Sequence, residues 1–169
     1  MNMSHRKTRR VGTAAALVVL GAMAGAGAAG ASDFTVDFPV GTACNFPLRV
    51  DGTGGNRIDR TFTDEAGNLV RILSTGTGFA LTFTNLSTGK TLSLPSNGAV
   101  TRTTPLAGGL TRNVLTGHNV LFLYPSDVPA GPSTTLFTGR AVFTATPSSD
   151  YTLLETHGTS RDLCAELSD

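Results

Sequence analysis

The sequence predicts an all-β domain built as an antiparallel meander. Apolar and polar residues alternate with a period of two in several short segments, among them residues 34–38 and 79–83. This is the period of strands that are buried on one face. Gly and Asn recur between these segments, where they supply the positive φ that tight hairpins need. No segment shows the period of a long amphipathic helix.

The alternation defines each strand, and the turn residues define where it ends. We expect strands at residues 34–40, 47–51, 58–64, 69–74, 79–85, 90–95, 99–103, 110–115, 119–124, 134–138, 141–146 and 151–156. Turn signals lie at residues 64–68, 87–89, 96–98, 108–109, 116–117 and 138–139. Glycine-rich residues 51–57 and proline-rich residues 125–133 should be irregular loops. One or two helical turns are expected at residues 160–167.

Successive hairpins dominate this pattern, and long crossovers are scarce. A sheet with this many strands and no covering helices must close on itself or fold into two packed layers. We therefore expect an up-and-down barrel. A β-sandwich is the alternative.

The N-terminus has the pattern of a secretory signal peptide. Basic residues between His5 and Arg10 precede an uncharged run at residues 11–31, which ends in Ala29-Gly30-Ala31. Basic, apolar and small-residue regions in this order are typical of a cleaved signal. We expect residues 1–31 to be removed and residues 32–169 to form a single secreted domain. A retained membrane helix is the alternative, although Gly and Ala contribute little to membrane insertion.

The charge of residues 32–169 excludes some partner classes. This part contains nine Lys and Arg residues against twelve Asp and Glu residues. A mildly acidic domain with scattered arginines lacks the basic patch that nucleic acids or anionic membranes require. We therefore expect no nucleic-acid partner, and no membrane association after signal cleavage.

The two cysteines, Cys44 and Cys164, lie near opposite ends of the predicted domain. An even cysteine count in an exported protein predicts a disulfide. A redox or metal pair is disfavoured, because the spacing matches neither C-x-x-C nor a zinc pattern. In a closed meander the first and last strands are neighbours. The bond should then secure the seam between them.

Several short stretches resemble small exported proteins of high-GC Gram-positive bacteria. These stretches are Thr116-Gly117-His118-Asn119, residues 127–132 and Asp162-Leu163-Cys164-Ala165, together with the early Cys44. The resemblance implies export and paired cysteines. It implies no catalytic or binding residue.

No motif for catalysis, metal binding or cofactor binding occurs in residues 32–169. The two histidines there, His118 and His157, are the candidate bases for a hydrolase. Such an enzyme needs a nucleophile and a carboxylate to converge on the histidine. We expect neither histidine to be catalytic, and we expect no metal or cofactor.

Nine phenylalanines remain to be explained. They could line an apolar ligand cavity inside a barrel, but an ordinary core is the preferred interpretation because aromatic residues commonly dominate cores. The expected function is therefore a non-enzymatic secreted domain that binds a partner protein or an apolar small molecule. The alternatives are an extracellular hydrolase near His118 or His157, and a passive envelope component.

Overall fold

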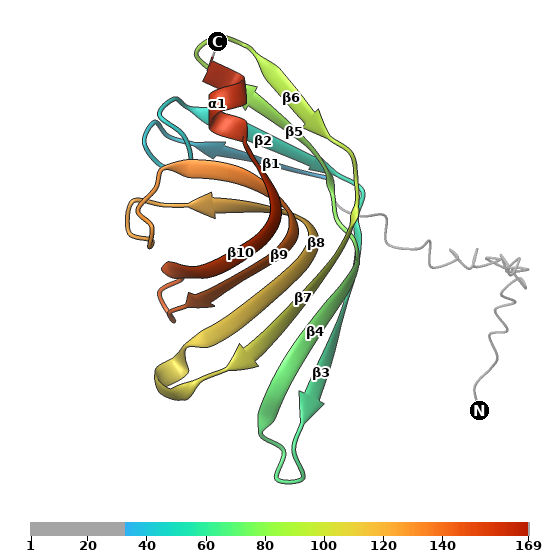
Figure 1. Ribbon diagram of the computed structural model, residues 1–169. Helices are drawn as coiled ribbons and strands as arrows, with labels where there is room; N and C mark the ends of the chain where they lie inside the picture. The colour runs from blue at the N-terminus through green and yellow to red at the C-terminus, as the bar shows by residue number, and fades with distance from the viewer. Residues whose placement is uncertain (1–32, 169) are drawn as a thin grey trace, which may run out of the picture.

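A computed structural model describes residues 33–168, which form two antiparallel β-sheets and a short C-terminal helix (Figure 1). The four-stranded sheet has the order β1 (Phe34–Phe38), β2 (Leu48–Thr53), β5 (Ala80–Asn85) and β6 (Thr91–Leu94). The six-stranded sheet has the order β10 (Tyr151–Asp162), β9 (Ser133–Ala145), β8 (Thr111–Leu123), β7 (Gly98–Pro105), β4 (Leu69–Thr77) and β3 (Asn56–Thr63). A 3₁₀ turn, η1 (Ala107–Gly109), precedes β8, and α1 (Leu163–Ser168) follows β10. The all-β antiparallel prediction is confirmed.

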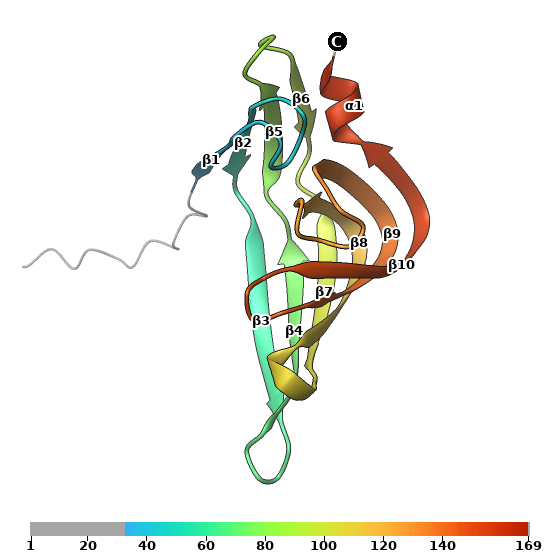
Figure 2. The ribbon, with the colours of Figure 1, turned by 90° about the vertical axis from the view of Figure 1, so that its left-hand side faces the viewer.

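The two sheets are two halves of one folded meander. In the smaller sheet Thr53 pairs with Ala80, and in the larger sheet Asn56 pairs with Thr77, so the register continues unchanged across the break. The register is likewise unchanged between the β4–β7 pair and the β5–β6 pair. Each long strand therefore pairs with the next one along the chain, and the whole meander folds along residues 54–55, 78–79 and 95–97 (Figure 2).

Within residues 33–168, no strand pairing joins β1 or β6 to β10. The closed barrel therefore stays a prediction. The helix α1 packs against β5 and β6 of the smaller sheet and against β9 of the larger one. Its residues Leu163 and Leu167 are fully buried.

The predicted disulfide between Cys44 and Cys164 is present, with a Cα–Cα distance of 5.6 Å. Cys44 follows the first strand and Cys164 lies in the last turn of the chain, but the first and last strands are not paired. Cys44 lies in the connection between β1 and β2, and Cys164 lies in α1, so the bond does not join two neighbouring strands. It ties the C-terminal helix to the connection between the first two strands.

A row of small residues crosses the larger sheet and bends its strands. Gly117 of β8 pairs with Gly139 of β9, and Gly139 pairs with Gly158 of β10. All three have positive φ, and the row continues through Ala99 to Gly76. The turns predicted at residues 116–117 and 138–139 are therefore wrong, because these glycines bend long strands instead of ending short ones (Figure 1).

The other irregular segments are partly as expected. The loop predicted at residues 51–57 is wrong, because β2 and β3 occupy this segment and only Gly54 and Gly55 interrupt them. The irregular connection predicted around residues 125–133 is present between β8 and β9. The predicted C-terminal helix is present as α1.

The main core lies between the smaller sheet, the end of β8, the start of β9 and α1. Its fully buried side chains include Leu48, Phe83 and Leu163. A second, smaller cluster surrounds Leu115, Leu121 and Ala141. Of the nine phenylalanines, only Phe83 is fully buried.

The signal peptide expected at residues 1–31 lies outside the described residues. In the part that the structure describes, no helix is long and apolar enough to cross a membrane.

Candidate functional site: a cavity along the fold of the meander

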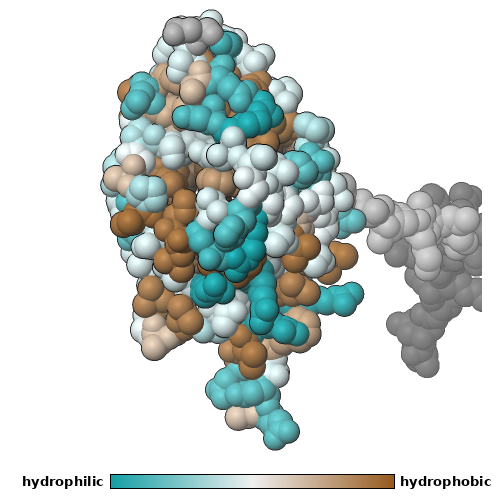
Figure 3. Space-filling view, viewed as in Figure 1, coloured by the Kyte–Doolittle hydropathy of each residue, from teal (hydrophilic) through white to brown (hydrophobic). Residues whose placement is uncertain are grey.

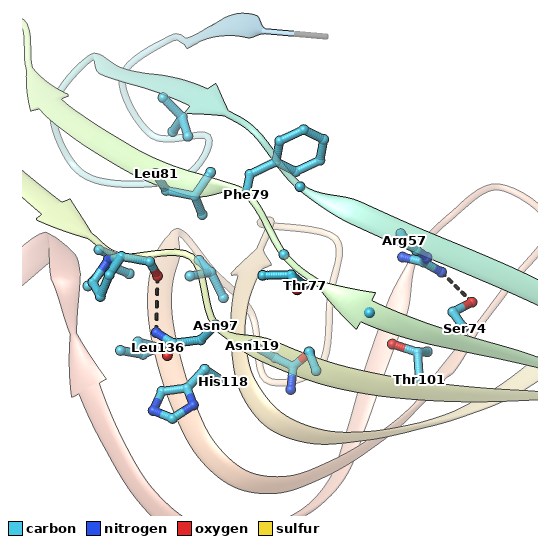
Figure 4. A pocket seen from close by; sticks show the side chains of 18 of the residues that line it. Arg57, Ser74, Thr77, Phe79, Leu81, Asn97, Thr101, His118, Asn119 and Leu136 are labelled. Atoms are coloured by element: carbon cyan, nitrogen blue, oxygen red, sulfur yellow. Dashed lines mark hydrogen bonds between the residues drawn. The ribbon is translucent and has the colours of Figure 1, made fainter. Parts of the chain in front are cut away.

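A cavity of about 830 Å³ lies where the meander folds. Every strand contributes to its wall, and Figure 4 shows part of the lining. The apolar side chains that line it come mainly from β1, β2, β5, β8 and β9, and they are Phe34, Val36, Phe38, Val50, Phe79, Leu81, Leu94, Val120, Phe122 and Leu136. The cavity therefore shares part of its wall with the main core.

The lining of the cavity continues across the break in the strands. Residues 74–79 line it in succession, and Leu81 of β5 follows them. Both sheets therefore present residues to one cavity.

Two glycines make room for aromatic rings in this wall. A Cβ atom at Gly52 would lie 2.3 Å from the ring of Phe34, and one at Gly55 would lie 3.2 Å from the ring of Phe79. The two rings meet edge to face with centroids 5.0 Å apart. Both remain accessible, with 36% of Phe34 and 39% of Phe79 exposed.

A second pair of rings lies deeper. Phe38 of β1 stacks on Phe122 of β8 with centroids 5.1 Å apart. Tyr124 lies against the same Phe38 ring at 6.4 Å. These rings join the smaller sheet to the larger one across the cavity.

A polar group occupies the β3–β4 side of the cavity. The Arg57 guanidinium donates from Nε to Asp59 at 3.1 Å and from Nη2 to the Ser74 hydroxyl at 2.7 Å (Figure 4). The pKa of the Asp59 carboxyl lies below its usual value, first because the Ser74 hydroxyl donates to it and second because Arg57 does. Asp59 therefore stays ionised, and the three side chains hold one another in place.

The β8–β10 side carries further polar groups. His118 and Asn119 of β8 and Thr138 of β9 line the cavity, with His118 opposite Thr138 in the ladder. Neither His118 nor Asn119 makes a side-chain hydrogen bond to another residue in 33–168. Arg161 of β10 also lines the cavity, but both arms of its guanidinium bind Glu166 of α1.

The candidate residues predicted from the sequence lie in different parts of the structure. His118 lines the cavity, whereas His157 lies on β10 among exposed residues and does not line it. Among the described residues, no hydroxyl or carboxylate forms a hydrogen bond with either histidine, so the arrangement needed for the hydrolase alternative is not formed. Cys44 and Cys164 lie outside the cavity wall and act through their disulfide. Residues 33–168 contain no group of three or more potential metal ligands.

From the sequence, an apolar cavity was the less favoured interpretation of the phenylalanines. Four of the nine, Phe34, Phe38, Phe79 and Phe122, line the cavity. Phe46, Phe83, Phe137 and Phe143 pack in the two hydrophobic clusters. The alternation of phenylalanine with threonine correctly predicted strands but gave no sign of a cavity. The signal lay in the nearby glycines, Gly52 and Gly55, which leave space beside two of the rings.

Comparisons of this chain with protein-family models, curated proteins and solved structures find no match.

Proposed function

We propose that this protein is a secreted binding protein that holds an apolar small molecule in the cavity along the fold of its meander. The observation that carries the proposal is a cavity of about 830 Å³ lined largely by apolar side chains, four of them phenylalanines. Pockets for small molecules have volumes of roughly 300–1,000 Å³ and apolar walls with a few polar groups. This cavity has both properties.

The exposed aromatic rings favour a bound ligand. Phe34 and Phe79 keep more than a third of their surface in contact with solvent, although each belongs to the cavity wall. Covering apolar surface contributes about 25 cal/mol per Å². A ligand beside these rings would supply the contacts that a filled core would otherwise give.

Secretion and the barrel belong to the same proposal. A disulfide is typical of oxidising compartments, which supports cleavage after residue 31 and export of the domain. In the proposed function the folded meander acts as an up-and-down barrel wall around the ligand. The helix α1 and the disulfide cover the seam where strand pairing stops.

A partner protein is the other occupant to consider. Protein-binding surfaces often contain a large continuous apolar patch. On the face shown in Figure 3, apolar side chains form several separate patches among hydrophilic ones. The apolar lining of the cavity is the observation that favours a small molecule.

The test uses the neutral dye N-phenyl-1-naphthylamine, whose fluorescence rises in apolar surroundings. The folded domain should bind the dye saturably with one site per chain. Ala99→Trp places an indole in the cavity, because Ala99 lines its wall. The affinity should fall by about ten-fold or more, since overpacking a filled site costs about 1–3 kcal/mol.

The matched control is Val100→Trp, which adds an indole at the adjacent, exposed position outside the cavity wall. It should bind the dye as the unaltered protein does. Absence of saturable binding to the unaltered protein, or equal losses in both variants, would contradict the proposed function.

A further inference from the structure

We infer that the ligand is an amphiphile with an apolar chain and a carboxylate head, and that Arg57 binds this head. The inference rests on the proposed function and specifies its ligand class. It follows from the distribution of charge around the cavity, from the way Arg57 is held, and from the separation of polar and apolar residues along the wall.

The charge of the cavity wall is opposite to that of the domain. Residues 33–168 contain eleven Asp and Glu residues and nine Lys and Arg residues, which is an acidic balance. The charged side chains that line the cavity are the basic Arg57 and Arg161. Their carboxylate partners, Asp59 and Glu166, lie outside the lining. An anionic group is complementary to the basic side chains that the wall itself presents.

Arg57 is positioned to receive such a group. Its side chain is 63% exposed, so it stands where the cavity opens to solvent. Asp59 and the buried Ser74, which is 4% exposed, hold the guanidinium at Nε and Nη2. A guanidinium has five N–H donors, and its planar shape matches a carboxylate. The Ser74 hydroxyl is neutral, so it is a weaker partner for Nη2 of Arg57 than a ligand carboxylate would be.

The second arginine in the wall is less suitable. Arg161 binds Glu166 through both Nε and Nη2, at 3.0 and 2.7 Å, so its bidentate face already holds a carboxylate. His118 and Asn119 contribute polar groups on the β8 side. The head therefore lies at the Arg57 opening.

The apolar part of the wall then receives the rest of the molecule. Phe38, Val50 and Phe122 line the cavity from β1, β2 and β8, away from the β3–β4 strands that carry Arg57. A carboxylate at the opening stays partly solvated, which avoids the cost of burying a charge. A long-chain carboxylic acid with its chain directed inward satisfies both regions.

The experiment compares dodecanoate with 1-dodecanol as competitors of N-phenyl-1-naphthylamine. The unaltered protein should bind dodecanoate about five-fold more tightly at low salt, which is the upper end for an exposed ion pair. Arg57→Gln should abolish this preference and leave the affinity for dodecanol unchanged. The control Arg60→Gln, which removes a charge from the same strand outside the cavity wall, should keep the preference.

Salt provides a test without any substitution. Because salt screens exposed charges, the preference for dodecanoate should decrease as ionic strength rises, while dodecanol binding should not weaken. Equal binding of acid and alcohol by the unaltered protein, or a preference that persists in Arg57→Gln, would overturn the inference. If neither the dye nor dodecanol binds, it is the proposed function itself that fails.

Discussion

Gly139 shows how a single residue can determine the path of several strands. It lies at the centre of a row in which Gly117 and Gly158 are its ladder partners on either side. Its φ is +133°, and a Cβ atom there would lie 2.3 Å from the carbonyl oxygen of His157. Both the backbone conformation and the close approach of β10 therefore require glycine. Without this row, β8, β9 and β10 could not bend as they do.

Replacing Gly139 by Ala should lower the free energy of unfolding by about 2 kcal/mol or more, because the variant is strained and clashes with β10. Chemical denaturation followed by circular dichroism measures this change. Gly98→Ala is the control, since a Cβ atom there meets nothing within 4 Å and its φ needs no glycine. If the two variants prove equally stable, Gly139 does not impose the bend.

The same residues show what a sequence window can reveal. Glycine with positive φ occurs in tight turns and also inside bent strands, so residues 116–117 and 138–139 suggested turns. Only the pairing of Gly117 with Gly139 distinguishes these two uses, and the partners lie far apart along the chain. The phenylalanines were ambiguous for a similar reason. A phenylalanine in a core and one in a cavity wall show the same alternation with polar residues along a strand.

At the scale of elements, α1 is stabilised by three kinds of contact. Leu163 and Leu167 are fully buried, and the Asn85 side chain donates to the carbonyl of Leu167 at 3.0 Å. The disulfide from Cys164 then fixes the helix to the β1–β2 connection. The sequence was sufficient to predict the bond and the helix. It could not reveal that the helix packs between the two sheets, against β5, β6 and β9.

Removing this bond should strongly destabilise the domain. It closes a loop with a sequence separation of 120 residues, for which chain-entropy arguments give about 5 kcal/mol. We expect the double variant Cys44→Ala, Cys164→Ala to melt many degrees below the oxidised protein. Thermal unfolding with and without a reductant tests this, and the double variant controls for effects of the reductant itself. Equal melting temperatures for the oxidised and reduced protein would contradict this role for the disulfide.

At the scale of the whole molecule, one folded meander forms both the core and the cavity. The fold line at residues 54–55, 78–79 and 95–97 brings the two halves together, and the cavity lies along that line. The strands themselves were largely predictable, because alternation is a local property. The cavity was not predictable from a local pattern. It depends on where three paired strands bend together and on how far apart the two sheets then lie.

The most direct test of the account is a crystal structure with 12-bromododecanoate, whose bromine marks the end of the apolar chain. Anomalous scattering locates this atom independently of the rest of the ligand. The account predicts a bromine peak inside the cavity beside Phe38 and Phe122, with the carboxylate at Arg57. A bromine found only on the outer surface, or a cavity left empty at saturating ligand, would contradict the central claim that this domain carries an apolar molecule within its meander.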